Sequence, residues 1–242
     1  MSGLRIMGIF LAAGVLAATF GARAFPAQVT ARPEVGLTEE KLVAIASVAE
    51  EAIRTGKCPG AVVVIGHEGR VIYRKAFGHR ALVPEELPMT VDTIFDMASL
   101  TKVVATTTAI MQLVEQGKIV LSAPVTDYWP EFKANGKEAI SVRELMTHYS
   151  GLPPDLDLKP DWSGYGTAMK MIVGEKLIVP PGTRFSYSDI NFETLGELVR
   201  LVSGEPLDVY CFEHIFKPLG MKEGSSTARP SGIAPWSRKS CR

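Results

Sequence analysis

The most informative stretch of the sequence is FDMASLTK, which occupies residues 95–102. Ser99 and Lys102 lie three positions apart at the start of a predicted helix over residues 99–116, so both side chains fall on one helix face. The positive end of the helix dipole favours negative charge developing at Ser99. Partial burial is expected to lower the pKa of Lys102 toward a neutral amine that takes the Ser99 proton. The structural alternative is a helix-capping Ser99 beside a solvated Lys102.

The predicted helix over residues 99–116 carries apolar side chains on nearly all of its faces. A helix with this pattern is expected to be buried in the centre of a domain. Gly117 follows it, as is common at a helix end. The apolar residues are Leu100, Val103, Val104, Ala105, Ala109, Ile110, Met111, Leu113 and Val114.

The rest of the chain is predicted to form one hairpin and several helices. A helix starts at Thr38 and ends at Gly56, and β-branched runs over 61–65 and 71–77 flank a turn at 66–69. A polar link follows over 80–93, and the later helices are predicted over 141–147, 165–173, 191–202 and 207–216. A hairpin of two strands is marginal by itself, so it requires further strands, and none is evident after Tyr187.

A second polar cluster is Tyr187-Ser188-Asp189, which follows a turn at Pro180-Pro181-Gly182. A tyrosine beside a cationic lysine can have a lowered pKa and carry a proton between groups. The structural alternative is that Tyr187 packs against its neighbours while Asp189 caps the following helix.

Composition excludes several classes of function. Lys+Arg and Asp+Glu each number 26, so no basic field exists to attract nucleic acid. The 3 Cys are too few for a disulfide-stapled scaffold, and the 4 His show no paired ligand spacing. We therefore expect no nucleic-acid partner, no metal site and no cofactor.

The N-terminus reads as a secretory signal over residues 1–24. Arg5 precedes an uncharged apolar run over residues 6–20, and Ala22-Arg23-Ala24 forms a cleavage site. The run is shorter than the roughly 20 residues of a membrane span. We expect cleavage after Ala24, no stable membrane span thereafter, and a periplasmic or secreted product; an uncleaved anchor is the alternative.

Several segments together resemble the serine β-lactamase-like hydrolases: class C β-lactamases, D-alanyl-D-alanine carboxypeptidases and family VIII esterases. The similarity spans roughly residues 37–222, and its pieces occur in the order of that family. They are PGAV (59–62), FDMASLTK (95–102), VTDYWPEF (125–132), LMTHYSGLP (145–153), PGTRFSYSD (181–189) and IFKPLGM (215–221).

The resemblance implies roles for the two polar clusters. Ser99 would be the acyl-forming nucleophile, with its backbone N–H as one oxyanion donor. Lys102 would be the base partner of Ser99, and Tyr187 would protonate the leaving group. Asp189 would occupy a substrate-binding position.

Two departures from the family pattern bear on substrate and activity. Asp189 stands where the family's Y-x-N motif has Asn, and an ionised Asp cannot donate a hydrogen bond. Esterase-like members of the family that the sequence resembles accept an Asp at this position, so the resemblance favours ester or peptide substrates over antibiotics. In addition, the family has a K-T-G or H-T-G triad downstream of this tyrosine, and this sequence contains no Lys or His followed by Thr-Gly or Ser-Gly after Tyr187. The similar tripeptide Arg54-Thr55-Gly56 does not replace it, because it precedes the nucleophile.

The expected fold is α+β and β-lactamase/transpeptidase-like, with a helical lobe and an incomplete antiparallel-sheet lobe. Residues 25–80 are assigned to the sheet lobe and 81–222 to the helical lobe, while 223–242 form an atypical polar tail that is expected to be disordered. A further hypothesis is that a frameshift or truncation replaced the C-terminal part at about residue 223. The leading hypothesis is a secreted serine hydrolase that acts through a Ser99 acyl-enzyme on small ester, peptide or β-lactam substrates. An inactive remnant or pseudoenzyme is the alternative, so activity of this chain stays open.

Overall fold

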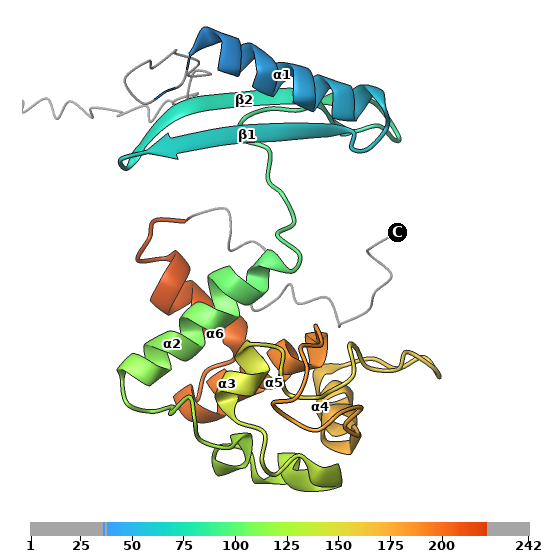
Figure 1. The fold of residues 1–242 in the computed structure, drawn as a ribbon, viewed down its shortest axis with the longest axis vertical. Coiled ribbons are helices and arrows are strands. Elements are labelled where there is room, and N and C mark those ends of the chain that lie inside the picture. The colour runs from blue at the N-terminus through green and yellow to red at the C-terminus, as the bar shows by residue number, and fades with distance from the viewer. Residues whose placement is uncertain (1–35, 37, 222–242) are drawn as a thin grey trace, which may run out of the picture. The chain divides into compact units, whose positions relative to one another are not determined.

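The computed structural model describes residue 36 and residues 38–221, and the chain divides into two compact units between Thr93 and Ile94 (Figure 1). The predicted signal sequence and the polar tail from residue 223 lie outside the described residues. The four predicted site residues all belong to the second unit.

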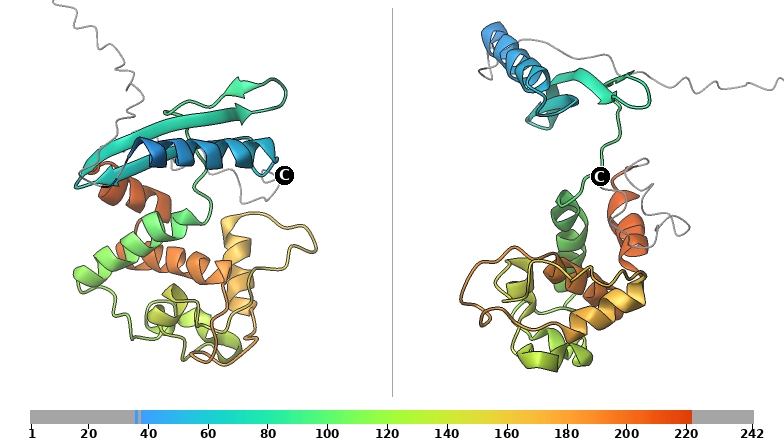
Figure 2. Two further views of the ribbon diagram at one scale, coloured as in Figure 1. Left: turned by 45° about the horizontal axis from the view of Figure 1, so that its top comes forward. Right: turned by 90° about the vertical axis from the view of Figure 1, so that its right-hand side faces the viewer.

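The first unit is a helix packed on a small antiparallel sheet. Helix α1 (Glu39–Arg54) contacts strands β1 (Gly60–His67) and β2 (Arg70–Ala81) and lies along one face of the sheet (Figure 2). The Thr38 hydroxyl caps α1 by accepting the Lys41 backbone N–H at 3.4 Å. The predicted helix and hairpin are therefore confirmed.

The sheet has the strand order β1-β2-β3, with β3 at Leu87–Pro88. This third strand lies inside the segment that the sequence predicted to be a polar link, so that prediction was wrong at this point. Proline is compatible with a short edge strand because such a strand does not need every ladder donor. The buried centre of this unit is small and consists of Leu42, Ile72 and Tyr73.

The described part of the second unit is built from helices and short helical turns. A π-helical segment, η2 (Lys102–Thr107), continues into α2 (Thr108–Glu115) and forms the predicted helix that follows Ser99. The remaining elements are η3 (Val125–Asp127), η4 (Pro130–Gly136), α3 (Val142–Met146), α4 (Tyr165–Gly174), α5 (Asp189–Ser203), α6 (Leu207–Cys211) and η5 (Phe212–Phe216).

Helix α5 lies at the centre of this unit. It contacts η2, α2, α3, α4 and α6, and most of its residues from Ile190 to Val199 are buried. Gly204 ends it in a left-handed conformation with φ +82°, which suits glycine. A single large core surrounds α5, so the N-terminal end of α5, where Asp189 lies, is fixed by extensive packing.

The sequence predicted that the helix after Ser99 is buried on all sides. That prediction was wrong, because one side of the helix is exposed. Ala105, Ala109, Ile110 and Leu113 face the core, whereas the opposite side is exposed. Within this unit, η2 and α2 pack against α5 and α6 on one side only. The exposed apolar residues are Leu100, Val103, Val104 and Met111.

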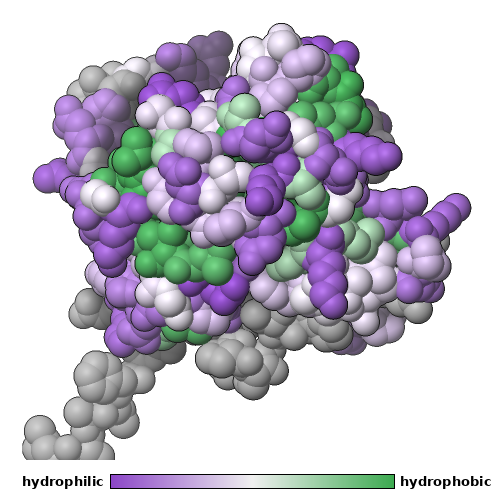
Figure 3. Space-filling view, turned by 90° about the horizontal axis from the view of Figure 1, so that it is seen from below, coloured by the Kyte–Doolittle hydropathy of each residue, from purple (hydrophilic) through white to green (hydrophobic). Residues whose placement is uncertain are grey.

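The α+β prediction is confirmed by the helices and the three-stranded antiparallel sheet. In the part of the chain that the structure describes, no helix is long and apolar enough to cross a membrane. On the face shown in Figure 3, hydrophobic residues form separate patches among hydrophilic ones.

Candidate active site

Ser99 and Lys102 are adjacent in space, as their spacing predicted. The Lys102 Nζ donates a hydrogen bond to the Ser99 Oγ at 3.2 Å. Ser99 is exposed, whereas only 16% of the Lys102 side chain is exposed. The nucleophile candidate therefore faces solvent while its partner is held against the protein.

The turn before Ser99 has an unusual backbone conformation. Ala98 has φ +43°, a region that non-glycine residues rarely adopt. The Asp96 Oδ1 accepts the Ala98 backbone N–H at 2.8 Å and so stabilises the turn. Strained residues of this kind concentrate at functional sites.

Tyr187 and Asp189 converge on the same lysine from the N-terminal end of α5. The Asp189 Oδ1 lies 2.7 Å from the Lys102 Nζ, and that nitrogen lies 5.0 Å from the centroid of the Tyr187 ring. Ser188, not Asp189, occupies the N-cap position of α5. The structure thus brings together all four residues that the sequence singled out.

The charges in this cluster differ from the sequence expectation. Burial lowers the pKa of Lys102, but hydrogen bonds and charge interactions with Asp189 and Tyr187 outweigh it, so its pKa is raised. The predicted lowering was wrong because burial was considered without the ion pair. Conversely, hydrogen bonds with Lys102 and then Ser99 lower the pKa of the Tyr187 phenol.

Comparison with known proteins places this geometry in a family. The model of the family described as Beta-lactamase matches residues 41–238. The chain belongs to the beta-lactamase family. Its resemblance to these enzymes and the β-lactamase/transpeptidase-like fold are therefore confirmed.

The chain spans about half the length of the relatives and solved structures that it matches. The N-acetylmuramyl-L-alanine amidase of Bacillus subtilis (strain 168) is 33% identical, over 81% of this chain and 48% of its own. The octameric penicillin-binding protein homologue of Pyrococcus abyssi has a TM-score of 0.65 at 30% identity, covering 75% of this chain and 43% of its own. A class C beta lactamase of Rhodobacter sphaeroides has a TM-score of 0.64 at 27% identity, covering 74% and 49%.

His148 is a residue of this family site to which the sequence analysis gave no role. It follows α3, which a capping box between Ser141 and Glu144 opens. The His148 Nδ1 lies 3.1 Å from the Ser188 backbone nitrogen, and its ring centroid lies 4.5 Å from that of Tyr187. The only available signal was its place in LMTHYSGLP.

Glu193 is the second residue that the sequence analysis missed. It lies one turn after Asp189 on α5, and both of its carboxyl oxygens are buried without a hydrogen-bond partner in the described structure. Burial, followed by the Asp189 charge, raises its pKa to about 7, although Lys102 acts in the opposite direction. No sequence pattern distinguishes this glutamate from the other acids of α5.

Other candidate groups do not form a site. Cys58 and Cys211 are free thiols, and burial raises the pKa of Cys211 to about 12. Cys241 lies outside the described residues. Among the residues that the structure describes, no three His, Cys, Asp or Glu side chains are placed to hold a metal ion.

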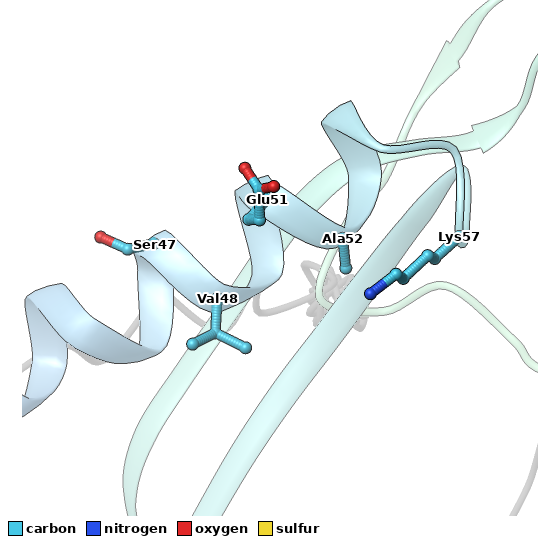
Figure 4. A pocket seen from close by; sticks show the side chains of 5 residues that line it. All are labelled: Ser47, Val48, Glu51, Ala52 and Lys57. Carbon is cyan, nitrogen blue, oxygen red and sulfur yellow. The ribbon is translucent and has the colours of Figure 1, made fainter.

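A surface depression in the first unit contains none of the candidate residues. It is lined on α1 by Ser47, Val48, Glu51 and Ala52, and by Lys57 beyond the helix (Figure 4). Val48 is 72% exposed, so the depression is open. The active-site assignment therefore rests on the cluster around Lys102.

Proposed function

We propose that this chain is a serine hydrolase of the beta-lactamase family that acts through an acyl-enzyme on Ser99. The observation that carries the proposal is the convergence of Ser99, Tyr187 and Asp189 on the Lys102 Nζ. A nucleophile needs a neighbour that accepts its proton, and that neighbour in turn needs a group that orients it. Ser99, the Tyr187 phenol and Lys102 supply these three functions.

In the proposed reaction, the Ser99 Oγ attacks the carbonyl carbon of an ester, peptide or β-lactam. A C–O bond forms while the Ser99 proton passes to the Tyr187 phenolate, which the Lys102 ammonium stabilises. Collapse breaks the bond to the leaving group, and Tyr187 returns the proton to that alcohol or amine. Water then attacks the acyl carbon while Tyr187 accepts its proton. Collapse breaks the bond to the Ser99 Oγ, and Tyr187 returns the proton to that oxygen, which regenerates Ser99.

The charge state of Lys102 explains this division of roles. Because Asp189 and Tyr187 hold the pKa of Lys102 above its ordinary value, Lys102 is cationic near neutral pH. A cation stabilises the phenolate form of Tyr187, whose pKa is lowered. Lys102 is therefore the electrostatic partner of the base.

The presence of Asp189 supports esters or peptides as the substrate class. Its carboxylate is paired with Lys102 and cannot donate a hydrogen bond to a substrate amide.

We also propose that residues 1–24 direct export and are removed after Ala24. Sequencing the N-terminus of the mature protein tests export, and an intact Met1 in the exported fraction contradicts cleavage.

Acylation of the full chain tests the hydrolase proposal. The protein is treated with a fluorophosphonate and, separately, with a labelled penicillin, and adducts are read by intact mass. We expect an adduct that Ser99→Ala abolishes and that Ser122→Ala, a change at an exposed serine in the second unit, leaves intact. A folded chain that forms no adduct would overturn the proposal and favour the pseudoenzyme alternative.

A further inference from the structure

His148 holds the backbone on both sides of Tyr187. The His148 carbonyl oxygen accepts the Ser186 backbone N–H at 2.8 Å, and the His148 Nδ1 accepts the Ser188 N–H at 3.1 Å. One residue thus fixes the residue before Tyr187 and the residue after it. Two hydrogen bonds that bracket a single side chain restrict the direction in which that side chain leaves the backbone.

The imidazole ring also restrains the Tyr187 side chain. The two ring centroids lie 4.5 Å apart with an interplanar angle of 33°. On other sides, the imidazole is packed by Phe192 of α5 at 5.2 Å and by Phe185 at 5.8 Å. Because Tyr187 itself is 45% exposed, these contacts limit rotation of a side chain that would otherwise be free to move.

The contacts of His148 require one protonation state. The Ser188 N–H is a donor, so the Nδ1 must carry a lone pair and the proton must reside on the Nε2. The Asn191 Nδ2 also lies 3.2 Å from the Nδ1, while the Asn191 Oδ1 accepts the Ser150 hydroxyl at 2.6 Å. The Asn191 amide is thereby oriented with its donor toward His148.

The backbone around His148 is constrained, and the surroundings of its imidazole favour the neutral form. Its φ of +60° is rare for a side-chain-bearing residue, and the chain maintains it beside Gly151. A Cβ at Gly151 would lie 2.1 Å from the Val179 carbonyl oxygen, so only glycine permits this path. Burial, and then the Lys102 charge, lower the pKa of His148 below 6.5, whereas Asp189 raises it.

We propose that neutral His148 is a positioning residue that aims the Tyr187 phenol at Ser99 and Lys102. Protonation at the Nδ1 removes the acceptor of the Ser188 N–H and adds a second cation beside Lys102. Tyr187 then loses its alignment, and acylation stops on the acid side. This inference rests on the proposed function, because its kinetic consequence requires Tyr187 to transfer the proton.

Two substitutions of His148 separate the effect of its Nδ1 acceptor from the effect of its aromatic ring. His148→Phe keeps an aromatic ring against Tyr187 but removes the acceptor, whereas His148→Asn keeps an acceptor near the Nδ1 position and tolerates the positive φ. The matched control is His214→Phe, because His214 also stacks on a tyrosine, Tyr210, with centroids 4.4 Å apart. All variants are compared by thermal unfolding before their activity is measured.

The kinetic test is the rate of fluorophosphonate acylation of the full chain from about pH 4 to about pH 9. Protonation of His148 and protonation of the Tyr187 phenolate should both inhibit the native chain, so we expect an acid limb of two protons. In His148→Phe we expect a rate at least about tenfold lower and an acid limb of one proton, which belongs to Tyr187 alone. His148→Asn should recover part of the rate, also with a one-proton limb. A folded His148→Phe that acylates at the native rate, or a two-proton acid limb in both variants, overturns the proposal.

A spectroscopic test keeps the inference separate from activity. Nitrogen chemical shifts of His148 should show a bare Nδ1 and a protonated Nε2 at neutral pH. Titration of the Tyr187 phenol should show its pKa returning toward 10.0 in His148→Phe. If the native chain forms no adduct, the proposed function fails. In that case the positioning role is decided by spectroscopy, and it fails if the Nδ1 is protonated or the titration of Tyr187 does not change.

Discussion

Two regions of the second unit bury an ionisable side chain, but they surround it differently. Near η4, the Lys137 side chain is fully buried, and its Nζ donates to the carbonyl oxygens of Ala134, Val173 and Glu175, each at 2.7 Å. Near the candidate site, both carboxyl oxygens of Glu193 are buried without a hydrogen-bond partner in the described structure. The first group has every donor satisfied, and the second has none of its oxygens satisfied.

The difference shows where a buried group lowers the free energy of unfolding of this chain. The Lys137 ammonium joins η4 to the end of α4, so its hydrogen bonds hold two segments of the packed core together. The Glu193 carboxyl lies one turn from Asp189, where an ionised form would add a second negative charge. Unsatisfied buried groups are costly and are retained mainly at functional sites.

The largest expected effect is the loss of the Lys137 contacts. Lys137→Met keeps the length of the side chain but leaves three partly buried carbonyl groups without the Lys137 donor, so the free energy of unfolding should fall by about 3 kcal/mol. Chemical denaturation of the full chain measures this change. The control is Lys133→Met, since Lys133 is exposed. A decrease no larger than that of the control would show that the carbonyl contacts contribute little.

The next effect has the opposite sign and depends on pH. The Glu193 pKa rises from 4.5 to about 7 on folding, so its penalty is absent below pH 4.5, grows between pH 4.5 and about 7, and is constant above that. Glu193→Gln should therefore raise the free energy of unfolding by about 2 kcal/mol at pH 8 and by much less at pH 4.5. Denaturation at both pH values checks this, with exposed Glu138→Gln as the control. Equal effects at the two pH values would contradict it.

The sequence was sufficient to predict what depends on local spacing. The contact between Ser99 and Lys102, the short helix after Ser141 and the hairpin follow from local spacing, and the structure contains each of them. The approach of Tyr187 to Lys102 came from family resemblance, because no local rule connects residues so far apart in the chain.

What the sequence did not predict depends on tertiary neighbours. The pKa of Lys102 is raised because Asp189 pairs with it, and burial alone gave the wrong sign. The donors of Lys137 meet backbone carbonyls from two other segments, and backbone groups leave no trace in a residue pattern. Likewise, nothing in the spacing of α5 indicates that Glu193 lacks a partner.

A smaller effect is expected at the capping box, where one carboxylate oxygen of Glu144 accepts two hydrogen bonds. The Glu144 Oε2 accepts the Ser141 backbone N–H and its hydroxyl, both at 2.8 Å. Ser141→Ala should lower the free energy of unfolding by about 1 kcal/mol, the usual value of an N-cap. Exposed Ser122→Ala serves as the matched control in thermal unfolding. If the two variants unfold alike, the box does not stabilise α3.

The smallest effect on stability, and the one most specific to the site, is expected for Asp189→Asn. The ion pair with Lys102 is partly exposed, with side chains 16% and 35% accessible, so its loss should change the free energy of unfolding by less than about 1 kcal/mol. Burial still lowers the pKa of Lys102, while the strongest opposing partner is gone, so that pKa should fall. Hydrogen bonding with Lys102, the largest cause, lowers the pKa of the Tyr187 phenol, whereas the Asp189 charge raises it. Removal of the Asp189 charge should therefore lower the pKa of Tyr187 further below 10.0. Titration of Tyr187 together with the acylation rate across pH measures this change. If Tyr187 titrates as in the native chain, Asp189 does not control the charges around Lys102, and the difference between the packed region and the site has to be explained by Glu193 alone.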